Sequence, residues 1–191
     1  MYHQPPRNDN SERTTMTVFC KSFWRSLFAG GAVTLALLGA MPATAVEEGE
    51  PAPDFTLPGV RASDAAVQLS ELQGKVVYVD FWASWCLPCL RSLPQINGLY
   101  EQYRDQGFEV VAITIDDPVE DATEFLEDLE VPLAYSVVLD ATADVMDQYR
   151  VVGMPTSFLI DRDGVIRKVH KGFREGDTEL LEQALIPLLA E

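Results

Sequence analysis

The feature that most constrains this chain is an apolar run, Val76–Trp82, followed directly by two closely spaced cysteines. The run is nearly continuous and rich in β-branched side chains, which predicts a central strand buried on both faces. Cys86 and Cys89 are three positions apart, so both fit within one turn of a helix that starts after the strand. The sequence therefore predicts a strand–turn–helix unit with two thiols where the helix begins.

A carboxylate lies inside this apolar run, where an ionised side chain is costly to bury. Strand periodicity puts Asp80 on the same face as Trp82, beneath the expected start of the helix. Burial should raise the pKa of Asp80, so we expect this residue to accept a proton from Cys89. The alternative interpretation is that Asp80 has only a structural role, with its carboxylate bonded to the backbone or to Lys75.

The two cysteines should differ in chemistry because they sit at different depths in the helix. Cys86 opens the helix, where the unpaired N–H groups and the positive end of the helix dipole favour the thiolate. Cys89 lies one turn further in, so it should be more buried and less ionised. We therefore expect Cys86 to attack a disulfide and Cys89 to resolve the mixed disulfide that forms. Trp85 and Pro88 should restrict solvent and fix the turn.

Other uses of the cysteines are less well supported. The third cysteine, Cys20, lies in the leader described below. A disulfide between residues so close together closes almost no loop and adds little stability through chain entropy. A structural zinc site needs four ligands, and His170 is the only histidine after the leader, so we expect no metal. We expect His170 itself to be a surface or sheet residue.

The first 45 residues have the pattern of a secretory signal peptide. A basic flank with Lys21 and Arg25 precedes the apolar stretch 27–41 and the small-residue triplet 43–45. This apolar stretch is shorter than the roughly 20 residues needed to span a bilayer. We expect cleavage after Ala45, with an uncleaved membrane anchor as the alternative. Residues 46–53 then form an exposed linker, and residues 54–191 form one domain.

The remaining chain is strongly acidic. After the leader it has 28 acidic and ten basic residues, a formal charge of −18. Such a charge argues against nucleic acid and against anionic membrane surfaces as partners.

The order of predicted elements gives an α/β fold with a mixed central sheet and helices on both faces. An N-terminal β-hairpin, at 54–57 and 66–69, should cover one edge of that sheet. Asp177 should cap the last helix. Further strands are predicted at 108–115, 134–139, 156–160 and 165–170, and helices at 90–103, 122–129, 141–149 and from Asp177 onward.

A second motif, Gly153-Met154-Pro155-Thr156, precedes an apolar strand, where proline marks a turn or a strand start. With Trp85-Cys86-Leu87-Pro88-Cys89 and Pro94, it makes the chain resemble the thioredoxin superfamily. The chain is most similar to the exported TlpA/ResA-like thiol:disulfide oxidoreductases, over about residues 51–189. The segment Ala52–Leu57, at the start of the domain, and the segment Thr156–Gly164 are both typical of that group.

The resemblance implies roles for individual residues. Cys86 matches the nucleophile and Cys89 the resolving cysteine. Pro155 is expected to be cis and to pack against the cysteine pair, and the backbone of Met154 to bind the substrate chain beside Trp85. Pro88 and Gly153 would position these groups.

Two positions depart from the pattern of the TlpA/ResA-like group. Many members carry asparagine where this chain has Asp80, and a glutamate three residues after the second cysteine, where this chain has Ser92. Asp80 instead matches the buried aspartate of ordinary thioredoxins.

The function expected from these residues is thiol:disulfide exchange with proteins in the periplasm or on the outer face of the cytoplasmic membrane. The protein would act as a reductant, use no cofactor beyond its own cysteine pair, and be a monomer. It would receive electrons from a membrane thiol-disulfide donor. In the alternative in which the signal segment is not cleaved, that segment would tether the protein to the membrane. The alternatives are a dedicated apocytochrome c thioreductase in cytochrome c maturation and a redox-inert thioredoxin-fold adaptor.

Overall fold

The computed structural model describes residues 46–191, and the predicted signal peptide lies outside the described residues. Within residues 46–191, no helix is long and apolar enough to cross a membrane.

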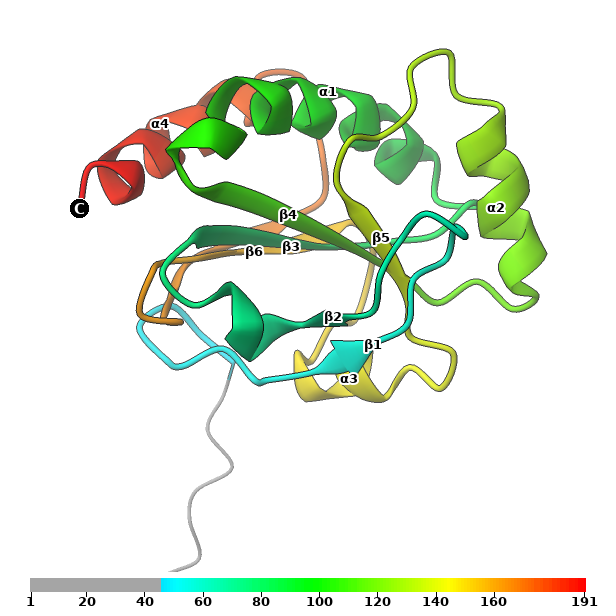
Figure 1. The fold of residues 1–191 in the computed structure, drawn as a ribbon, viewed down its shortest axis with the longest axis horizontal. Helices are drawn as coiled ribbons and strands as arrows, with labels where there is room; N and C mark the ends of the chain where they lie inside the picture. The colour runs from blue at the N-terminus through cyan, green and yellow to red at the C-terminus, as the bar shows by residue number, and fades with distance from the viewer. Residues whose placement is uncertain (1–45) are drawn as a thin grey trace, which may run out of the picture. The chain divides into compact units, whose positions relative to one another are not determined.

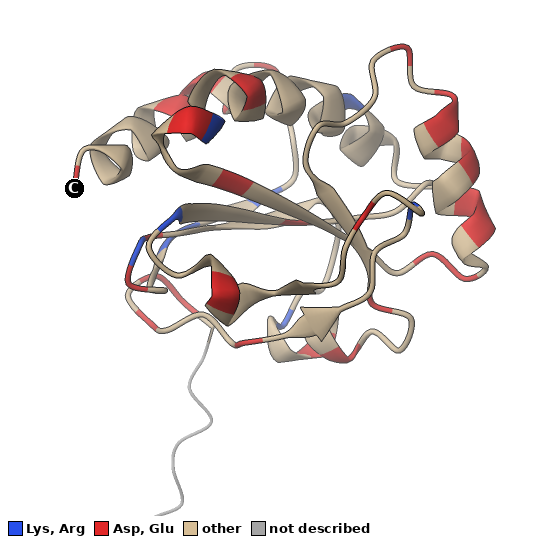
Figure 2. Cartoon of the chain, in the orientation of Figure 1, with Lys and Arg blue, Asp and Glu red and all other residues tan. Residues whose placement is uncertain are grey.

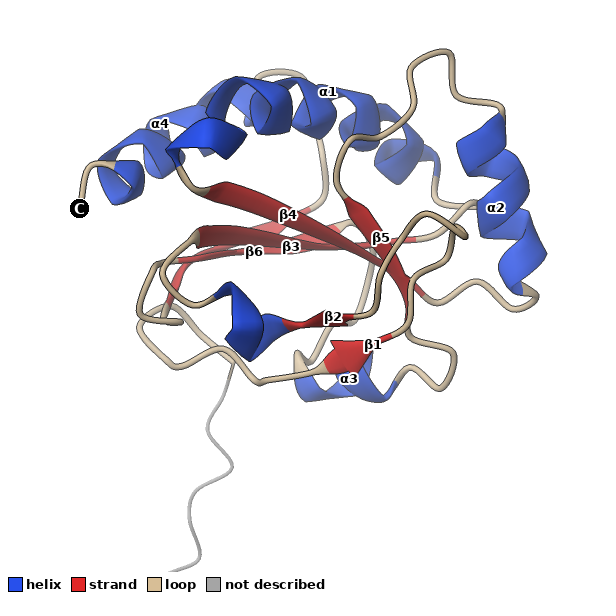
Figure 3. Ribbon diagram, in the orientation of Figure 1, coloured by secondary structure: helices blue, strands red, loops and turns tan. Residues whose placement is uncertain are grey.

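A five-stranded mixed sheet forms the centre of the domain (Figures 1 and 3). The strand order is β5-β4-β3-β6-β7, with β3 parallel to β4 and antiparallel to β6. Every residue of β3 is buried, as the apolar run predicted for a central strand. The strands are β3 (Val76–Trp82), β4 (Phe108–Thr114), β5 (Ser136–Leu139), β6 (Thr156–Ile160) and β7 (Ile166–Lys171).

Helices α1 (Leu87–Tyr103), α2 (Val119–Glu127) and α4 (Asp177–Leu189) pack over one face of this sheet. Their apolar side chains form one core with Tyr78 and Trp82 of β3, and Cys86 and Cys89 belong to the same core. Helix α1 continues through Pro94, and the short 3-10 helix η2 (Arg104–Gln106) follows it. In Figure 1, α1 and α4 lie together above the sheet.

The opposite face is covered by smaller elements. The two-stranded sheet of β1 (Thr56–Leu57) and β2 (Val67–Gln68) lies there with the 3-10 helix η1 (Leu69–Leu72) and α3 (Asp144–Gln148). Residues after β1 also pair with the free edge of β5, through a bridge between Gly59 and Val138. The predicted α/β architecture with an N-terminal hairpin is therefore confirmed.

Two local predictions need correction. The segment 46–53 is exposed or half-buried, as predicted, but it is bonded to the domain: Gly49 and Glu50 exchange backbone hydrogen bonds with Ile166, and Ala52 donates to Gly164. These bonds satisfy backbone groups at the start of β7, an edge strand that would otherwise leave them exposed. Asp177 is the first residue of α4 and Gly176 is its N-cap. The Asp177 carboxylate instead accepts from the Arg174 N–H at 2.6 Å and contacts His170.

Candidate active site at the start of helix α1

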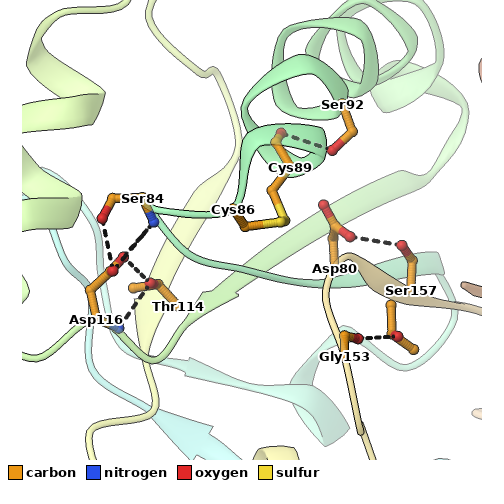
Figure 4. Close-up of a disulfide and its surroundings, with 10 residues drawn as sticks. Asp80, Ser84, Cys86, Cys89, Ser92, Thr114, Asp116, Gly153 and Ser157 are labelled. Atoms are coloured by element: carbon orange, nitrogen blue, oxygen red, sulfur yellow. Dashed lines mark hydrogen bonds between the residues drawn. A yellow bond between two sulfur atoms is a disulfide. The ribbon is translucent and has the colours of Figure 1, made fainter. Parts of the chain in front are cut away.

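The two cysteines form a disulfide at the end of the β3–α1 connection (Figure 4). The sulfur–sulfur distance is 2.01 Å and the two Cα atoms are 5.2 Å apart. Cys86 is the N-cap of α1, and no side chain caps the helix there. Cys86 is 5% exposed and Cys89 is fully buried, in the order that the sequence predicted. The Cys86 sulfur therefore lies at the positive end of a 17-residue helix, where a thiolate is favoured.

Asp80 lies beneath the disulfide and is only 2% exposed. Its Oδ1 accepts a hydrogen bond of 2.7 Å from the Ser157 hydroxyl, on the neighbouring strand β6. Its Oδ2 is buried and has no hydrogen-bond partner among the described residues. Figure 4 shows this second oxygen pointing toward the disulfide. One side of the carboxyl is thus held by the sheet, and the other faces the cysteine pair.

Burial raises the pKa of Asp80 to about 7, and the hydrogen bond from Ser157 only partly offsets that rise. The cause is desolvation, because a buried carboxylate loses its contacts with water. Lys75, the partner considered from sequence, does not reach Asp80: its ammonium pairs with Glu109 at 2.8 Å, at the opposite end of β3. A carboxyl group with a pKa near neutrality can both take up and release a proton under physiological conditions.

A second buried carboxylate, Asp116, holds the turn that leads into the disulfide. Its oxygens accept hydrogen bonds from the Ser84 backbone N–H at 3.0 Å and the Ser84 hydroxyl at 2.9 Å. The Thr114 hydroxyl donates to it at 2.6 Å. Since Ser84 is two residues before Cys86, these bonds fix the backbone from which the first cysteine projects. This network was not predicted from the sequence, although Asp116, two residues after the end of β4, was a visible signal.

Ser92 occupies the position of the glutamate that is common in the TlpA/ResA-like group. It is buried, and its hydroxyl donates to the Cys89 carbonyl at 2.9 Å. This is a local bond within the first turns of α1 and puts no acid near the sulfurs. Asp80 is therefore the carboxylate placed beneath the pair.

The loop before β6 lies on the same core as the disulfide. The Met154–Pro155 peptide bond is cis, as the resemblance implied. Met154 packs against the core that contains Cys86 and Cys89, and Pro155 is buried. The Thr156 hydroxyl donates to the Gly153 carbonyl at 2.6 Å, which closes the loop on itself. An open groove of about 310 Å³ runs along 152–156 and 171–172.

Large apolar side chains are exposed around the disulfide. Trp85 and Leu87, which flank Cys86, are each 67% exposed, and Val152 beside the groove is 92% exposed. The restriction of solvent at the disulfide by Trp85 stays a prediction. The exposed Trp85 side chain is placed to contact a partner. Pro88 occupies the first turn of α1, where the missing N–H costs no helix bond. Within residues 46–191, no group of three or more His, Cys, Asp or Glu side chains could hold a metal ion.

Comparison with known proteins decides the family. Residues 47–185 match the Redoxin family. The chain belongs to this family. It is 36% identical over 129 residues to the thiol-disulfide oxidoreductase ResA of Geobacillus kaustophilus, over 68% of this chain and 72% of the relative. It is 32% identical to ResA of Bacillus subtilis, over 78% of this chain and 86% of the relative.

Solved structures agree with this assignment. A crystal structure of a Chlorobium tepidum protein described as a thiol:disulfide interchange protein DsbE is 45% identical. It covers 75% of this chain and 98% of its own length, with a TM-score of 0.70. A Bacteroides thetaiotaomicron structure described as a protein disulfide isomerase is 34% identical, with a TM-score of 0.68, and covers 76% of this chain and 91% of its own. This Redoxin-family chain is thus a TlpA/ResA-like thiol-disulfide oxidoreductase with a thioredoxin fold.

Proposed function

We propose that this enzyme is an exported reductant that transfers two electrons from Cys86 and Cys89 to disulfides of partner proteins outside the cytoplasm. The observation that carries the mechanism is the Asp80 carboxyl, which is buried beneath the pair with one oxygen unbonded and directed at it. The leader pattern in residues 1–45 supports export.

The first step belongs to Cys86. Its thiolate, favoured at the start of α1, attacks a partner disulfide, forms a mixed disulfide and releases one partner sulfur as a thiolate. That sulfur takes a proton from water. The exposed Trp85 and the groove beside Met154 and Pro155 offer an apolar surface for the partner chain.

The second step belongs to Cys89 and Asp80. Ionised Asp80 takes the proton from the Cys89 thiol, and the resulting thiolate attacks the Cys86 sulfur. The bond between Cys86 and the partner breaks, the second partner sulfur leaves, and the Cys86–Cys89 disulfide forms. The enzyme is then oxidised by two electrons, and a membrane thiol-disulfide carrier would supply the electrons that reduce it again.

The acidic surface supports selection among partners. Figure 2 shows acidic residues along α2 and in the loops, with few basic residues. Protein disulfides on basic or neutral chains are therefore the substrates that we propose. A dedicated role in cytochrome c maturation has less support, because Ser92 stands where the group commonly has a glutamate and bonds only to the backbone.

Trapping tests the proposal. Cys89→Ala should accumulate mixed disulfides on Cys86 that mass spectrometry can identify, whereas the matched variant Cys86→Ala should accumulate none. The wild-type protein, supplied with a thiol reductant, should reduce insulin. Trapping through Cys89 would reverse the assigned roles. A measured potential near that of strong oxidants, more than about 100 mV above thioredoxin, would contradict the direction proposed.

A further inference from the structure

A row of polar side chains crosses the sheet behind Asp80. The strand register pairs Asp80 with Ser157, and Ser157 with His170. Residues that lie opposite each other in antiparallel strands project from the same face of a sheet. This face is otherwise the apolar floor of the core beneath α1 and α4. Asp80, Ser157 and His170 are therefore three neighbouring polar residues on a face that packs against the apolar core, and their presence there needs an explanation.

The row leads from the interior to the surface. The Ser157 hydroxyl donates to Asp80 at 2.7 Å, and both residues are buried. His170 Nε2 lies 3.0 Å from Oδ2 of Asp177, the first residue of α4. The side chains of His170 and Asp177 are 26% and 14% exposed, so this pair lies at the boundary with solvent.

A small cavity joins the two halves of the row. Its walls include the polar residues Tyr78, Ser157, His170 and Asp177, with apolar side chains from α1, β6 and α4 around them. The space open to the centre of a water molecule is about 10 Å³, which is room for about one water. Hydroxyl, imidazole and carboxylate groups give that water the two to four partners it needs.

We propose that this row carries the proton of Asp80 to solvent, from Asp80 to Ser157, through one water, and then to His170, which Asp177 orients. This inference rests on the proposed function, in which Asp80 takes a proton from Cys89. It assigns a proton-transfer role to His170, which the sequence analysis treated as a sheet or surface residue.

The proton balance is simple. Asp80 receives the proton of Cys89 at the oxygen that faces the sulfurs and becomes neutral. When the carboxyl turns about its last side-chain bond, that proton faces Ser157. The serine hydroxyl accepts it and passes its own proton to the water, and the water passes one to His170. The imidazole accepts on one nitrogen and releases a proton to solvent, and Asp80 is again a carboxylate.

The row of polar side chains reaches solvent at a place that the bound partner does not cover. During exchange the partner is covalently bound to Cys86, so the surface around Trp85 and Pro155 is covered. The row opens instead beside the start of α4, on the side of the sheet's β7 edge. A proton can leave there while the partner remains attached.

The other titratable groups near His170 do not replace it. Tyr78 of β3 keeps its proton, because burial and the nearby Asp80 charge raise its pKa well above the usual value. Lys168 of β7 lines the same cavity, Asp177 comes from α4, and Arg174 contributes a backbone N–H to Asp177. Helix α1 contributes only the apolar Ile96 to this cavity. Lys168 is therefore the matched control, since it borders the same space but forms no hydrogen bond or ion pair with Ser157 or Asp177 within residues 46–191.

The test measures the rate at which the mixed disulfide resolves. Reduced enzyme is mixed with saturating peptide disulfide in a stopped-flow instrument, and tryptophan fluorescence is followed from pH 5 to 9. At pH 5 to 7, part of the Asp80 is neutral at the start and must lose its proton before it can take one from Cys89. In this pH range we expect His170→Gln and Ser157→Ala to slow resolution about tenfold, with Lys168→Gln within twofold of wild type. Added imidazole should restore most of the rate in His170→Gly.

Three results would overturn the relay: an unchanged rate in His170→Gln, an equal slowing in Lys168→Gln, or no rescue by imidazole in a slowed His170→Gly. Asp80→Asn separates this failure from failure of the proposed function. If Asp80→Asn is slow and His170→Gln is not, the proton leaves by another route and Asp80 keeps its role. If both variants resolve at the wild-type rate, the role of Asp80 fails as well.

Discussion

Two buried aspartates lie on either side of the disulfide, and they differ in how fully their oxygens are bonded (Figure 4). Asp116 accepts from the Ser84 N–H, the Ser84 hydroxyl and the Thr114 hydroxyl. Asp80 accepts only from Ser157, and its second oxygen has no partner among the described residues. Both side chains are almost completely removed from water.

This difference in bonding distinguishes Asp116, a carboxylate that stabilises the turn, from Asp80, a carboxylate that takes part in the reaction. Three donors replace the water that Asp116 loses, so its oxygens are bonded and hold the turn before Cys86. One donor cannot replace the water that Asp80 loses, so its neutral form is favoured and its pKa approaches neutrality. Burial alone therefore does not identify a catalytic acid; an unbonded oxygen that faces the reactive sulfurs does.

The largest effect should appear in stability against pH. The pKa of Asp80 rises from 3.8 to about 7 on folding, so the folded state binds more protons than the unfolded state between those values. The wild-type free energy of unfolding should therefore fall as pH rises from about 4 to about 7, by up to about 4 kcal/mol. Asp80→Asn should remove this fall. Urea unfolding of the oxidised protein at pH 4, 6 and 8 measures it, and parallel profiles for both proteins would contradict the raised pKa.

The next effect is on the rate of exchange. At pH 8, Asp80→Asn should slow resolution of the mixed disulfide about 100-fold, because the variant lacks the carboxylate that takes the proton of Cys89. Asp116→Asn should change that rate less than threefold, since its bonds hold the backbone and touch no sulfur. Stopped-flow measurements of both variants make the comparison. A slower Asp116→Asn than Asp80→Asn would reverse the two assignments.

A smaller effect concerns the turn. Asp116→Asn loses charge-assisted hydrogen bonds and should lower the free energy of unfolding by about 2 kcal/mol. Ser84→Ala removes one of those bonds and should cost about 1 kcal/mol. Urea unfolding of both variants beside the wild type measures these losses. A larger loss in Ser84→Ala than in Asp116→Asn would contradict the assignment of Asp116 as the centre of this network.

The smallest effect tests the single bond to Asp80. The Ser157 hydroxyl lowers the pKa of Asp80, so Ser157→Ala should raise that pKa above about 7. An NMR titration of the Asp80 carboxyl carbon in the oxidised protein gives the value directly. The shift should be less than about one unit, worth at most about 1.4 kcal/mol. A fall in the pKa would mean that another donor replaces Ser157.

Much of the fold could be predicted from local pattern. The β-branched run became β3, the apolar stripe from Leu90 to Tyr103 lies within α1, and period-two alternation put Asp80 beneath the start of that helix. These predictions succeed because each depends on neighbours within one strand or one helical turn. Element ends were less accurate: α2 begins at Val119, not at Ala122, and α3 spans only Asp144–Gln148.

The hydrogen-bond partners of the two aspartates could not be predicted from local sequence pattern. Ser157 is 77 residues from Asp80, and only the pairing of β6 with β3 brings them together. Lys75, five residues from Asp80, was the natural partner to consider, but it points to Glu109 on β4. Asp116 and Ser84 meet because β4 runs parallel to β3, so both chains leave the sheet at the same end.

The types of chemical group were therefore readable from the chain alone: a thiol pair at a helix start with an acid nearby. What each group does depends on contacts made by folding. Desolvation sets the protonation of Asp80, and distant segments decide which buried oxygen finds a donor. Both are properties of the packed environment, since they arise from atoms that the sequence places far apart and the sheet brings together.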